Sequence, residues 1–358
     1  MENKYTVTSL FTGIGGLDSG FGGSVIVPAN AISESAFISH IREYNFVELK
    51  KKDFEIVFQN DIDKGVENVL KMNGTYHNFS NVSIYDLVNA DYSFPIADVI
   101  IGGFPCQSFS HAGKRLGFEN KKSHNVSDEV NSKNNSGNLY KSYVAVVRKT
   151  KPKLFVAENV LGLLTMKNAL NQIMTDFASV GYMVEYQVVD CTEYGISQTR
   201  KRVIIMGIRN DFTGTLDKEW NFVTKNKNTC FLREYIQHLK EPIETDDISQ
   251  KLFSKAKKLN KGQGQTAVSL DGFAPTIRSE HHGNIEFRRL FQDSRVESLG
   301  MPRRLTVREA GLIQTFPPNF KFTEKTMSGP YRWIGNAVPP LLSYLIADKV
   351  HDILQKHF

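Results

Sequence analysis

Side chains that could act on a carbon centre or on a base stand in three separate segments. Cys106 follows a strand-like run and a proline in a glycine-flanked turn, a setting that leaves a thiol exposed and reactive. Glu158 closes another strand-like run with a carboxylate. Arg200 and Arg202 lead into a strand two residues apart, so both guanidinium groups would share one face and could hold a phosphate or a base. Of these side chains, the Cys106 thiol is the candidate nucleophile.

Taken singly, each of these segments has a plainer interpretation. A lone cysteine is most often a small buried apolar residue, which we expect of Cys191 and Cys230. Charged segments are by default solvated surface.

A glycine-rich turn and an acidic residue indicate a nucleotide-like ligand. Phe11-Thr-Gly-Ile-Gly-Gly16 follows the first strand-like run, although its spacing departs from the G-x-G-x-x-G of NAD sites. Asp61 ends the second such run, where a carboxylate would hold a ribose diol. A tight turn with nothing bound, and a helix cap at Asp61, remain open alternatives.

Alternating strands and helices are predicted to position these residues. Strands are expected at 5–10, 55–59, 97–101, 153–157 and 202–208, with helices to about Met72, over 139–149 and from Pro340 to about His357. Such spacing is typical of βαβ units and a mostly parallel sheet. Ligands bind beyond the carboxyl ends of such strands, where the glycine turn, Asp61, Cys106 and Glu158 all fall.

Two stretches interrupt this alternation, and a third loses it. Residues 24–52 are longer than a usual connection, and the polar residues 119–138 predict a mobile loop. Residues 210–302 lose the rhythm, so we expect a second domain there. The expected division is 1–209 plus 321–358 for the larger, discontinuous domain and 210–320 for the smaller one.

The composition excludes several classes of protein. With 358 residues, 41% hydrophobic and 23% charged, the chain can bury a core, and it has no apolar run long enough for a membrane span. No signal peptide is apparent, and three cysteines without C-x-x-C spacing disfavour a disulfide scaffold and structural zinc. We therefore expect a cytoplasmic protein with no metal.

The net charge of +6 is compatible with a polyanionic partner. Residues 209–304 hold 17 Lys and Arg against 13 Asp and Glu, which marks where a nucleic acid would dock.

In their order along the chain, these segments resemble the cytosine-C5 DNA methyltransferase family, of the bacterial type II restriction-modification kind. The matching segments are Phe11-Thr-Gly-Ile-Gly-Gly16, Pro105-Cys106-Gln107, Glu158-Asn159-Val160, Gln198-Thr-Arg200-Lys-Arg202, Arg304-Leu-Thr-Val-Arg308-Glu309-Ala310 with Gln314-Thr-Phe-Pro317, and Gly335-Asn336-Ala337-Val338. The family's fold is a Rossmann-like S-adenosylmethionine-dependent sheet with a smaller, mixed target-recognition domain. Residues 210–302 lie where the family keeps its variable recognition region.

The resemblance implies a covalent mechanism. Cys106 matches the thiolate that adds to C6 of cytosine, beside Gln107, and Glu158 matches the carboxyl group that contacts N3 and the exocyclic amine. Arg202 matches the contact to O2 of the base, and Arg200 is its neighbour in the motif. The target base would be flipped out of the duplex, with residues 107–138 closing over it.

The resemblance also implies a cofactor, S-adenosylmethionine, and residues that bind it. The implied cofactor residues are Phe11, Gly13, Ile14, Gly15, Asp61, Ile62, Ile84, Gly103, Pro105, Leu139, Asn336, Ala337 and Val338. At the adenine contact, Ser83-Ile84 matches by spacing and Asp86 is a rival.

Double-stranded DNA is the expected partner, and a cognate restriction endonuclease a genetic one; a monomer is expected. The residues expected to contact DNA are Ser110, Arg278, His282, Arg288 and Arg289, with His281 also worth testing. A tRNA cytosine methyltransferase is the nearest alternative, and an inactive DNA-binding relative is a second. A plain NAD dehydrogenase fails on the glycine spacing and on Cys106.

Overall fold

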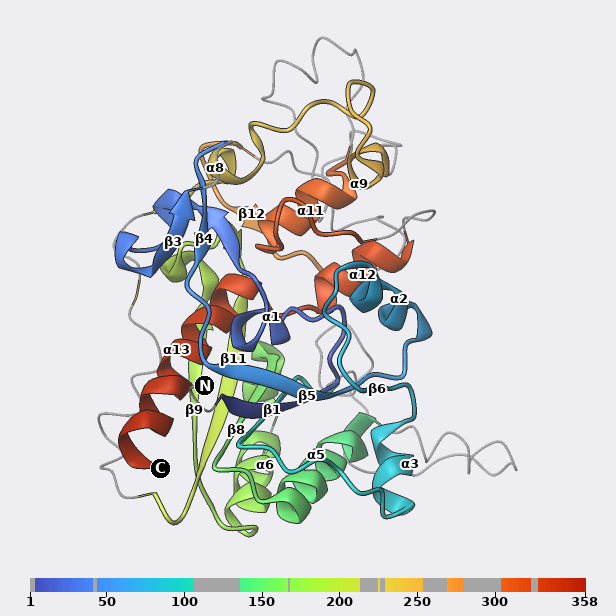
Figure 1. Cartoon of the computed structure of the whole chain (residues 1–358), viewed down its shortest axis with the longest axis vertical. Helices are drawn as coiled ribbons and strands as arrows, with labels where there is room; N and C mark the ends of the chain where they lie inside the picture. Colours follow the sequence, from blue (N-terminus) through green and yellow to red (C-terminus); the bar gives the residue numbers. More distant parts are fainter. Residues whose placement is uncertain are drawn as a thin grey trace.

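A seven-stranded sheet with the strand order β6–β5–β1–β7–β8–β11–β9 runs through the computed structural model (Figure 1). The structure describes residues 4–40, 44–105, 136–166, 168–212, 225, 229–253, 269–279, 304–322 and 328–358. The strands are β1 (Tyr5–Leu10), β5 (Phe54–Asn60), β6 (Phe79–Ser80), β7 (Val99–Gly102), β8 (Leu154–Val160), β9 (Tyr182–Asp190) and β11 (Lys201–Arg209). β1, β5, β6, β7 and β8 run parallel, and β11 is antiparallel to both of its neighbours. The predicted mostly parallel α/β sheet is confirmed.

Helices cover both faces of this sheet, because its central strands are apolar on both sides. In β7, Val99 and Ile101 join one buried cluster while Ile100 joins the other. One face packs on α3 (Ile84–Asn89), α5 (Ser136–Thr150) and α6 (Ala169–Ala178), and the other on α1 (Asp18–Phe21), α2 (Lys64–Met72) and α13 (Pro340–His357). The helices predicted to end near Met72, to span 139–149 and to begin at Pro340 are all present.

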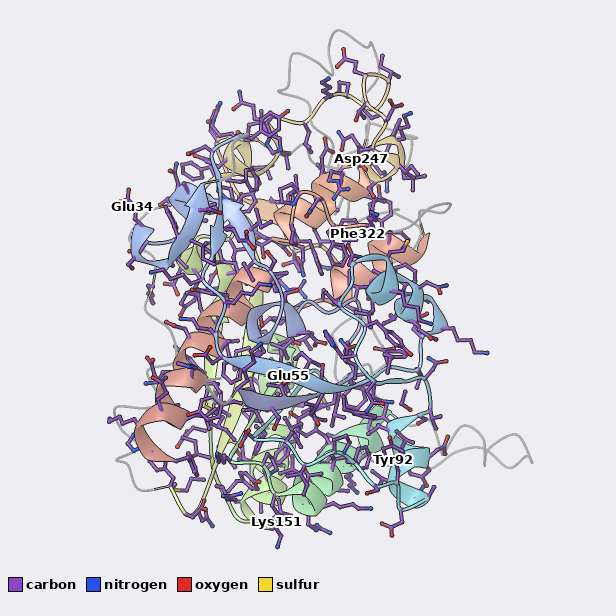
Figure 2. The ribbon with its side chains drawn as sticks, viewed as in Figure 1. Glu34, Glu55, Tyr92, Lys151, Asp247 and Phe322 are labelled. Atoms are coloured by element: carbon purple, nitrogen blue, oxygen red, sulfur yellow. The ribbon has the colours of Figure 1, made fainter. Side chains whose placement is uncertain are left out.

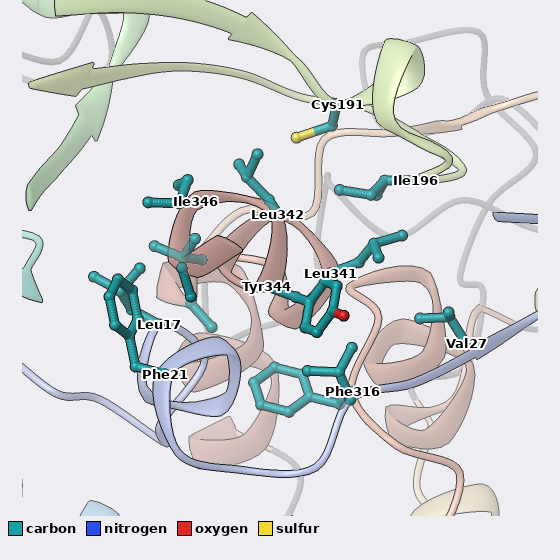
Figure 3. Close-up of a cluster of buried hydrophobic side chains, with 14 of the residues drawn as sticks. Leu17, Phe21, Val27, Cys191, Ile196, Phe316, Leu341, Leu342, Tyr344 and Ile346 are labelled. Atoms are coloured by element: carbon teal, nitrogen blue, oxygen red, sulfur yellow. The ribbon is translucent and has the colours of Figure 1, made fainter. Parts of the chain in front are cut away.

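The C-terminal helix α13 packs closely on the glycine turn's own helix, α1. A Cβ atom on Gly20 would lie 2.2 Å from the carbonyl carbon of Ser343, so only glycine permits this approach. Figure 3 shows Leu17 and Phe21 in one buried cluster with Leu342, Ile346 and other side chains. The last part of the chain is thereby attached beside the first strand.

Residues 24–52, predicted only as a long connection, form a second small sheet. Its antiparallel strands are β2 (Ile26–Pro28), β4 (Phe46–Leu49) and β3 (Phe37–His40), with the 3₁₀ turns η1 (Ala29–Ala31) and η2 (Glu34–Ala36) between β2 and β3. Gly195 lies against the η1 turn of this region, since a Cβ there would lie 2.0 Å from the Ala31 carbonyl oxygen. Of the mobile loop predicted over 119–138, residues 119–135 lie outside the described residues, and 136–138 form the start of α5.

The described parts of 210–320 hold short helices. These are α8 (Leu232–Ile236), α9 (Ile248–Lys251) and α11 (Val307–Ile313), and the two-residue strand β12 (Ala274–Pro275) pairs with β10 (Gln198–Thr199). Arg308 of α11 reaches Asp247 at 2.6 Å and lies over the Phe322 ring, both labelled in Figure 2. The predicted domain boundaries remain a prediction.

Short 3₁₀ turns complete the described elements of the sheet region. η4 (Leu161–Thr165) follows β8, and η5 (Cys191–Tyr194) follows β9. The helix α12 (Ser328–Asn336) precedes α13. None of the helices within the described ranges has the length and apolar character that a membrane crossing requires.

Candidate active site and cofactor cradle

The carboxyl ends of four parallel strands meet at one edge of the sheet. Leu10 pairs with both Asn60 and Gly102, and Gly102 pairs with Ala157. The next residues of these strands are Phe11, Asp61, Gly103 and Glu158. The strand register therefore brings together four residues that the sequence placed in separate motifs.

The glycine turn is held open by its backbone conformation. Phe11, Gly13 and Gly15 all have positive φ, at 54°, 54° and 80°. The Thr12 amide donates to the Asn60 carbonyl at 2.9 Å, which ties the turn to the end of β5. A Cβ on Gly13 would meet nothing within 4 Å, so the space beside this residue is open.

Two residues expected to cradle the cofactor face the core instead. The Ile14 side chain is 1% exposed within the apolar cluster of α1 and α13. Gly15 is buried, and a Cβ atom on it would lie 3.3 Å from Leu70 Cδ2. Only their backbones remain available, because the turn folds these positions inward.

Asp61 joins the glycine turn to the end of β5. Its Oδ2 accepts the Gly13 amide at 2.8 Å, and its Oδ1 accepts the Asp63 amide at 2.9 Å. Burial raises the pKa of Asp61, against the lowering effect of these two hydrogen bonds. The helix cap considered for Asp61 belongs to Asp63, whose Oδ1 accepts the Gly65 amide at the start of α2.

Ile62, directly after Asp61, exposes 65% of its surface. An exposed branched apolar side chain beside a carboxylate suits an adenosine, with the carboxylate on the ribose and the apolar surface against the base. Ile84, the second residue expected beside the adenine, is not exposed in this way: its side chain is 1% exposed in the core at the start of α3. Asp86, the rival, is exposed.

The C-terminal residues expected to complete the cradle reach the glycine turn. A Cβ on Gly16 would lie 2.3 Å from the Val338 carbonyl oxygen and 3.0 Å from the Ala337 Cβ. Ala337 and Val338 are 9% and 6% exposed, while Asn336 is exposed. The fold thus joins the first and last motifs of the chain.

Glu158 forms an ion pair with Arg202 at the same edge of the sheet. Their Oε1 and Nε atoms are 2.7 Å apart, and the two side chains are 10% and 11% exposed. A Cβ on Gly103 would lie 3.2 Å from Glu158 Oε2, so this glycine leaves room for the carboxylate. The Asn159 amide group donates to the Phe104 carbonyl at 3.2 Å and ties β8 to the chain that leads to Cys106.

Some of the other residues expected at this site belong to the described part of the chain, and others do not. Pro105 and Leu139 are partly exposed, whereas seven others lie outside the described residues: Cys106, Gln107, Ser110, His281, His282, Arg288 and Arg289. Arg278 is exposed, and its backbone packs against Gly335.

Cys191 and Cys230 are buried as predicted, and burial raises the pKa of the Cys191 thiol to about 12.

Arg200 does not share the open setting expected for it. Its side chain is 1% exposed, and its guanidinium donates to the carbonyls of Ile277, Gly335 and Ala337 at 2.9–3.1 Å. A guanidinium enclosed by backbone oxygens cannot also hold a phosphate or a base. The prediction that both arginines contact the ligand is therefore wrong for Arg200. The two side chains do not share one strand face, because Arg200 lies between the end of β10 and the start of β11.

Two glutamines that sequence reasoning passed over complete this network. Gln198 Oε1 accepts the Ile277 amide at 3.0 Å, and its Nε2 donates to Gln314 Oε1 at 2.7 Å. Gln314 Nε2 donates to the Ala337 carbonyl at 2.5 Å. Both stand inside motifs already recognised, so the signal was present, but their buried partners come from distant segments.

Asp63, Arg332 and Trp333 were also missed. Asp63 Oδ2 accepts from Arg332 Nη2 at 2.6 Å and from Trp333 Nε1 at 2.8 Å. Their adjacency to Asp61 and to Gly335-Asn336 was the available signal.

Comparison with known proteins agrees with this arrangement. The model of the C-5 cytosine-specific DNA methylase family matches residues 5–352. The chain is 32% identical to the Type II methyltransferase M.BsuRI of Bacillus subtilis, over 97% of this chain and 79% of that one. It is 31% identical to the Type II methyltransferase M.NgoFVII of Neisseria gonorrhoeae, over 95% and 84%.

Solved structures with low sequence identity share the fold. The S. pombe Dnmt2 methyltransferase aligns with a TM-score of 0.66 at 17% identity, covering 98% of this chain and 99% of that one. The Entamoeba histolytica methyltransferase EhMeth aligns with a TM-score of 0.64 at 15% identity, covering 99% of both. On the extent of the family match and these identities, the chain belongs to the C-5 cytosine-specific DNA methylases and is a DNA (cytosine-5)-methyltransferase.

Proposed function

We propose that this enzyme transfers a methyl group from S-adenosylmethionine to C5 of a cytosine flipped out of a short, specific double-stranded DNA sequence. The observation that carries the proposal is the juxtaposition at one sheet edge of an open glycine turn, a carboxylate that holds it, and the Glu158–Arg202 pair. One half suits an adenosine cofactor and the other a pyrimidine base.

The residues present fit S-adenosylmethionine. The space beside Gly13 is open, Asp61 lies next to it, and Ile62 offers an exposed apolar surface. Asp61 would hold the ribose hydroxyls, Ile62 would lie against the adenine, and Phe11 and Asn336 would complete the walls. Gly103, Pro105, Leu139 and the backbones of Ala337 and Val338 are further members of this proposed cradle. When bound, the cofactor would supply an electrophilic methyl group to C5 of the base.

The chain's own groups would prepare the base. C5 of cytosine is a poor nucleophile, and addition of the Cys106 thiolate to C6 makes it enamine-like. Glu158 would contact N3 and the exocyclic amine and support protonation of the ring as the thiolate adds. Arg202 would contact O2, its orientation fixed by the ion pair with Glu158. After loss of the C5 proton, elimination of the Cys106 thiolate restores the aromatic ring.

Arg200 is assigned a different role from Arg202. Since its guanidinium is enclosed by three backbone carbonyls, we assign it to positioning the 335–337 segment rather than to base contact.

The basic segment within 210–320 would read the DNA, with Arg278 as its described exposed arginine. The larger domain would comprise 1–209 and 321–358. We further propose a cytoplasmic, monomeric enzyme that protects its host DNA against a cognate restriction endonuclease, as the Type II names of its relatives support.

Base-resolution sequencing of 5-methylcytosine in plasmid DNA from cells that express the protein tests the proposal. Methylation at one short motif, absent with a Cys106→Ala variant, is the expected result. Folded protein that leaves DNA unmethylated would overturn the DNA substrate, and transfer RNA would then be tested as the acceptor.

A further inference from the structure

A second carboxylate, two residues beyond Asp61, carries more contacts than a helix cap needs. Asp63 Oδ1 caps α2 through the Gly65 amide at 2.9 Å. Its other oxygen, Oδ2, accepts from both Arg332 Nη2 at 2.6 Å and Trp333 Nε1 at 2.8 Å. Capping uses one oxygen, so the contacts on Oδ2 serve something else.

The Trp333 indole is fitted between two glycines. A Cβ on Gly65 would lie 2.3 Å from the indole Cζ2, and one on Gly329 would lie 2.8 Å from Cη2. Any side chain at either position would displace the ring. The ring and its N–H are therefore held in one place by shape as well as by the hydrogen bond.

The contact joins two segments of the proposed cofactor cradle. On one side, the Asp63 amide donates to Asp61 Oδ1, and Asp61 Oδ2 accepts the Gly13 amide. On the other side, the Trp333 carbonyl accepts the Ala337 amide at 3.0 Å, at the start of the Asn336–Val338 segment. Asp63 thus connects Asp61, the carboxylate proposed to bind the ribose, to the Asn336–Val338 segment near the C-terminus.

We propose that Asp63, Arg332 and Trp333, here called the Asp63 clasp, are positioning residues that set the affinity for the cofactor. The clasp holds Asp61 and Asn336 at their working separation before the cofactor arrives, so that binding need not order them. This inference rests on the proposed cofactor site.

The test uses two variants of the full-length protein and isothermal titration with S-adenosylhomocysteine. Asp63→Ser keeps a good helix cap but loses the contacts to Arg332 and Trp333. Trp333→Phe keeps most of the ring but loses the N–H. We expect the Kd to rise about fivefold to twentyfold for the first and about threefold to tenfold for the second. At saturating cofactor, kcat and the KM for DNA should stay within about twofold of wild type, as expected of lost cofactor binding alone.

Asp247→Ser is the matched control. Asp247 also caps a helix, through the Ser249 amide, and also pairs with an arginine, Arg308, but it belongs to α9. We expect this variant to lower the melting temperature while leaving the Kd for S-adenosylhomocysteine unchanged.

The outcomes separate the two proposals. A folded Asp63→Ser protein with wild-type affinity, or one in which only kcat falls, would overturn the clasp and leave the cofactor site standing. Wild-type protein that fails to bind S-adenosylhomocysteine would overturn the proposed cofactor site, and the clasp with it.

Discussion

Glu158 and Arg202 meet diagonally across two antiparallel strands, with Oε1 2.7 Å from Nε. The register of β8 and β11 sets Arg202 opposite Val160 and Glu158 opposite Ile204. Both side chains are about nine-tenths buried. Two charges withdrawn from water in this way depend on each other, because either one left alone keeps its desolvation cost without its partner's attraction.

Removal of one member of this pair should therefore cost more than removal of both. We expect Arg202→Met to lower the free energy of unfolding by about 2–4 kcal/mol, because Glu158 is left buried and unpaired. The double variant Glu158→Gln/Arg202→Met should recover part of this loss. Urea unfolding at neutral pH measures it, and single-variant losses that simply add in the double variant would contradict the coupling.

Gly13 and Gly74 offer a matched pair for testing the glycine turn. Both have positive φ, 54° and 66°, and a Cβ on either would meet nothing within 4 Å. Alanine at each position should cost about 1–2 kcal/mol of stability through the left-handed backbone. We expect only Gly13→Ala to weaken S-adenosylhomocysteine binding, by about tenfold or more, since its methyl group would enter the proposed cofactor space. Titration calorimetry on both variants distinguishes the two effects, and equal affinities would count against the site.

The sequence predicted the parts of this fold that local patterns determine. β1 was placed at its observed bounds and α13 at its Pro340 start, because apolar runs and a proline at a helix start are local signals. β9 and the small sheet of 24–52 were not predicted. β9 alternates irregularly and pairs with a later strand, while the small sheet forms through antiparallel pairing of three short strands and packs close to Gly195, far along the chain.

The candidate site shows the same division. The order of motifs placed Asp61 and Glu158 at the carboxyl ends of strands, which share one edge when the strands run parallel. Arg202 lies at the start of its strand, and it reaches the same edge because β11 runs antiparallel to β8. The motifs could not show that the Arg200 guanidinium is buried against three backbone carbonyls, or that the Ile14 and Ile84 side chains face the core. Those outcomes depend on segments that pack from far along the chain.

Asp18, the first residue of α1 after the glycine turn, makes the stability of the protein depend on pH in a defined direction. Burial raises the pKa of Asp18, although Ser9 and Gln59 hydrogen-bond its carboxylate at 2.6 and 2.7 Å and His77 also acts to lower it. The folded protein therefore keeps the Asp18 proton to a higher pH than the unfolded chain, whose carboxyl titrates near 3.8. The contribution of Asp18 to stability must fall as pH rises from that value through the raised pKa.

Asp18→Asn removes this titration while keeping a polar group of the same shape. We expect the variant to gain stability relative to wild type as pH rises from 3.8 through the raised pKa of Asp18, with a slope of at most about 1.4 kcal/mol per pH unit. Urea unfolding of both proteins across that range provides the measurement. A difference that stays constant or shrinks with rising pH would show that the Asp18 pKa is not raised.

Arg200→Lys tests whether the two arginines of one motif have separate roles. A lysine cannot reproduce the planar fork that reaches Ile277, Gly335 and Ala337, so the 335–337 segment should lose support. We expect a stability loss of about 2–4 kcal/mol and weaker S-adenosylhomocysteine binding. Arg202→Lys should instead lower kcat with little change in cofactor affinity, because its partner is Glu158. Melting temperature, Kd and kcat are measured on both variants. An Arg200→Lys protein that loses kcat alone would contradict the positioning role and indicate that Arg200 contacts the target base.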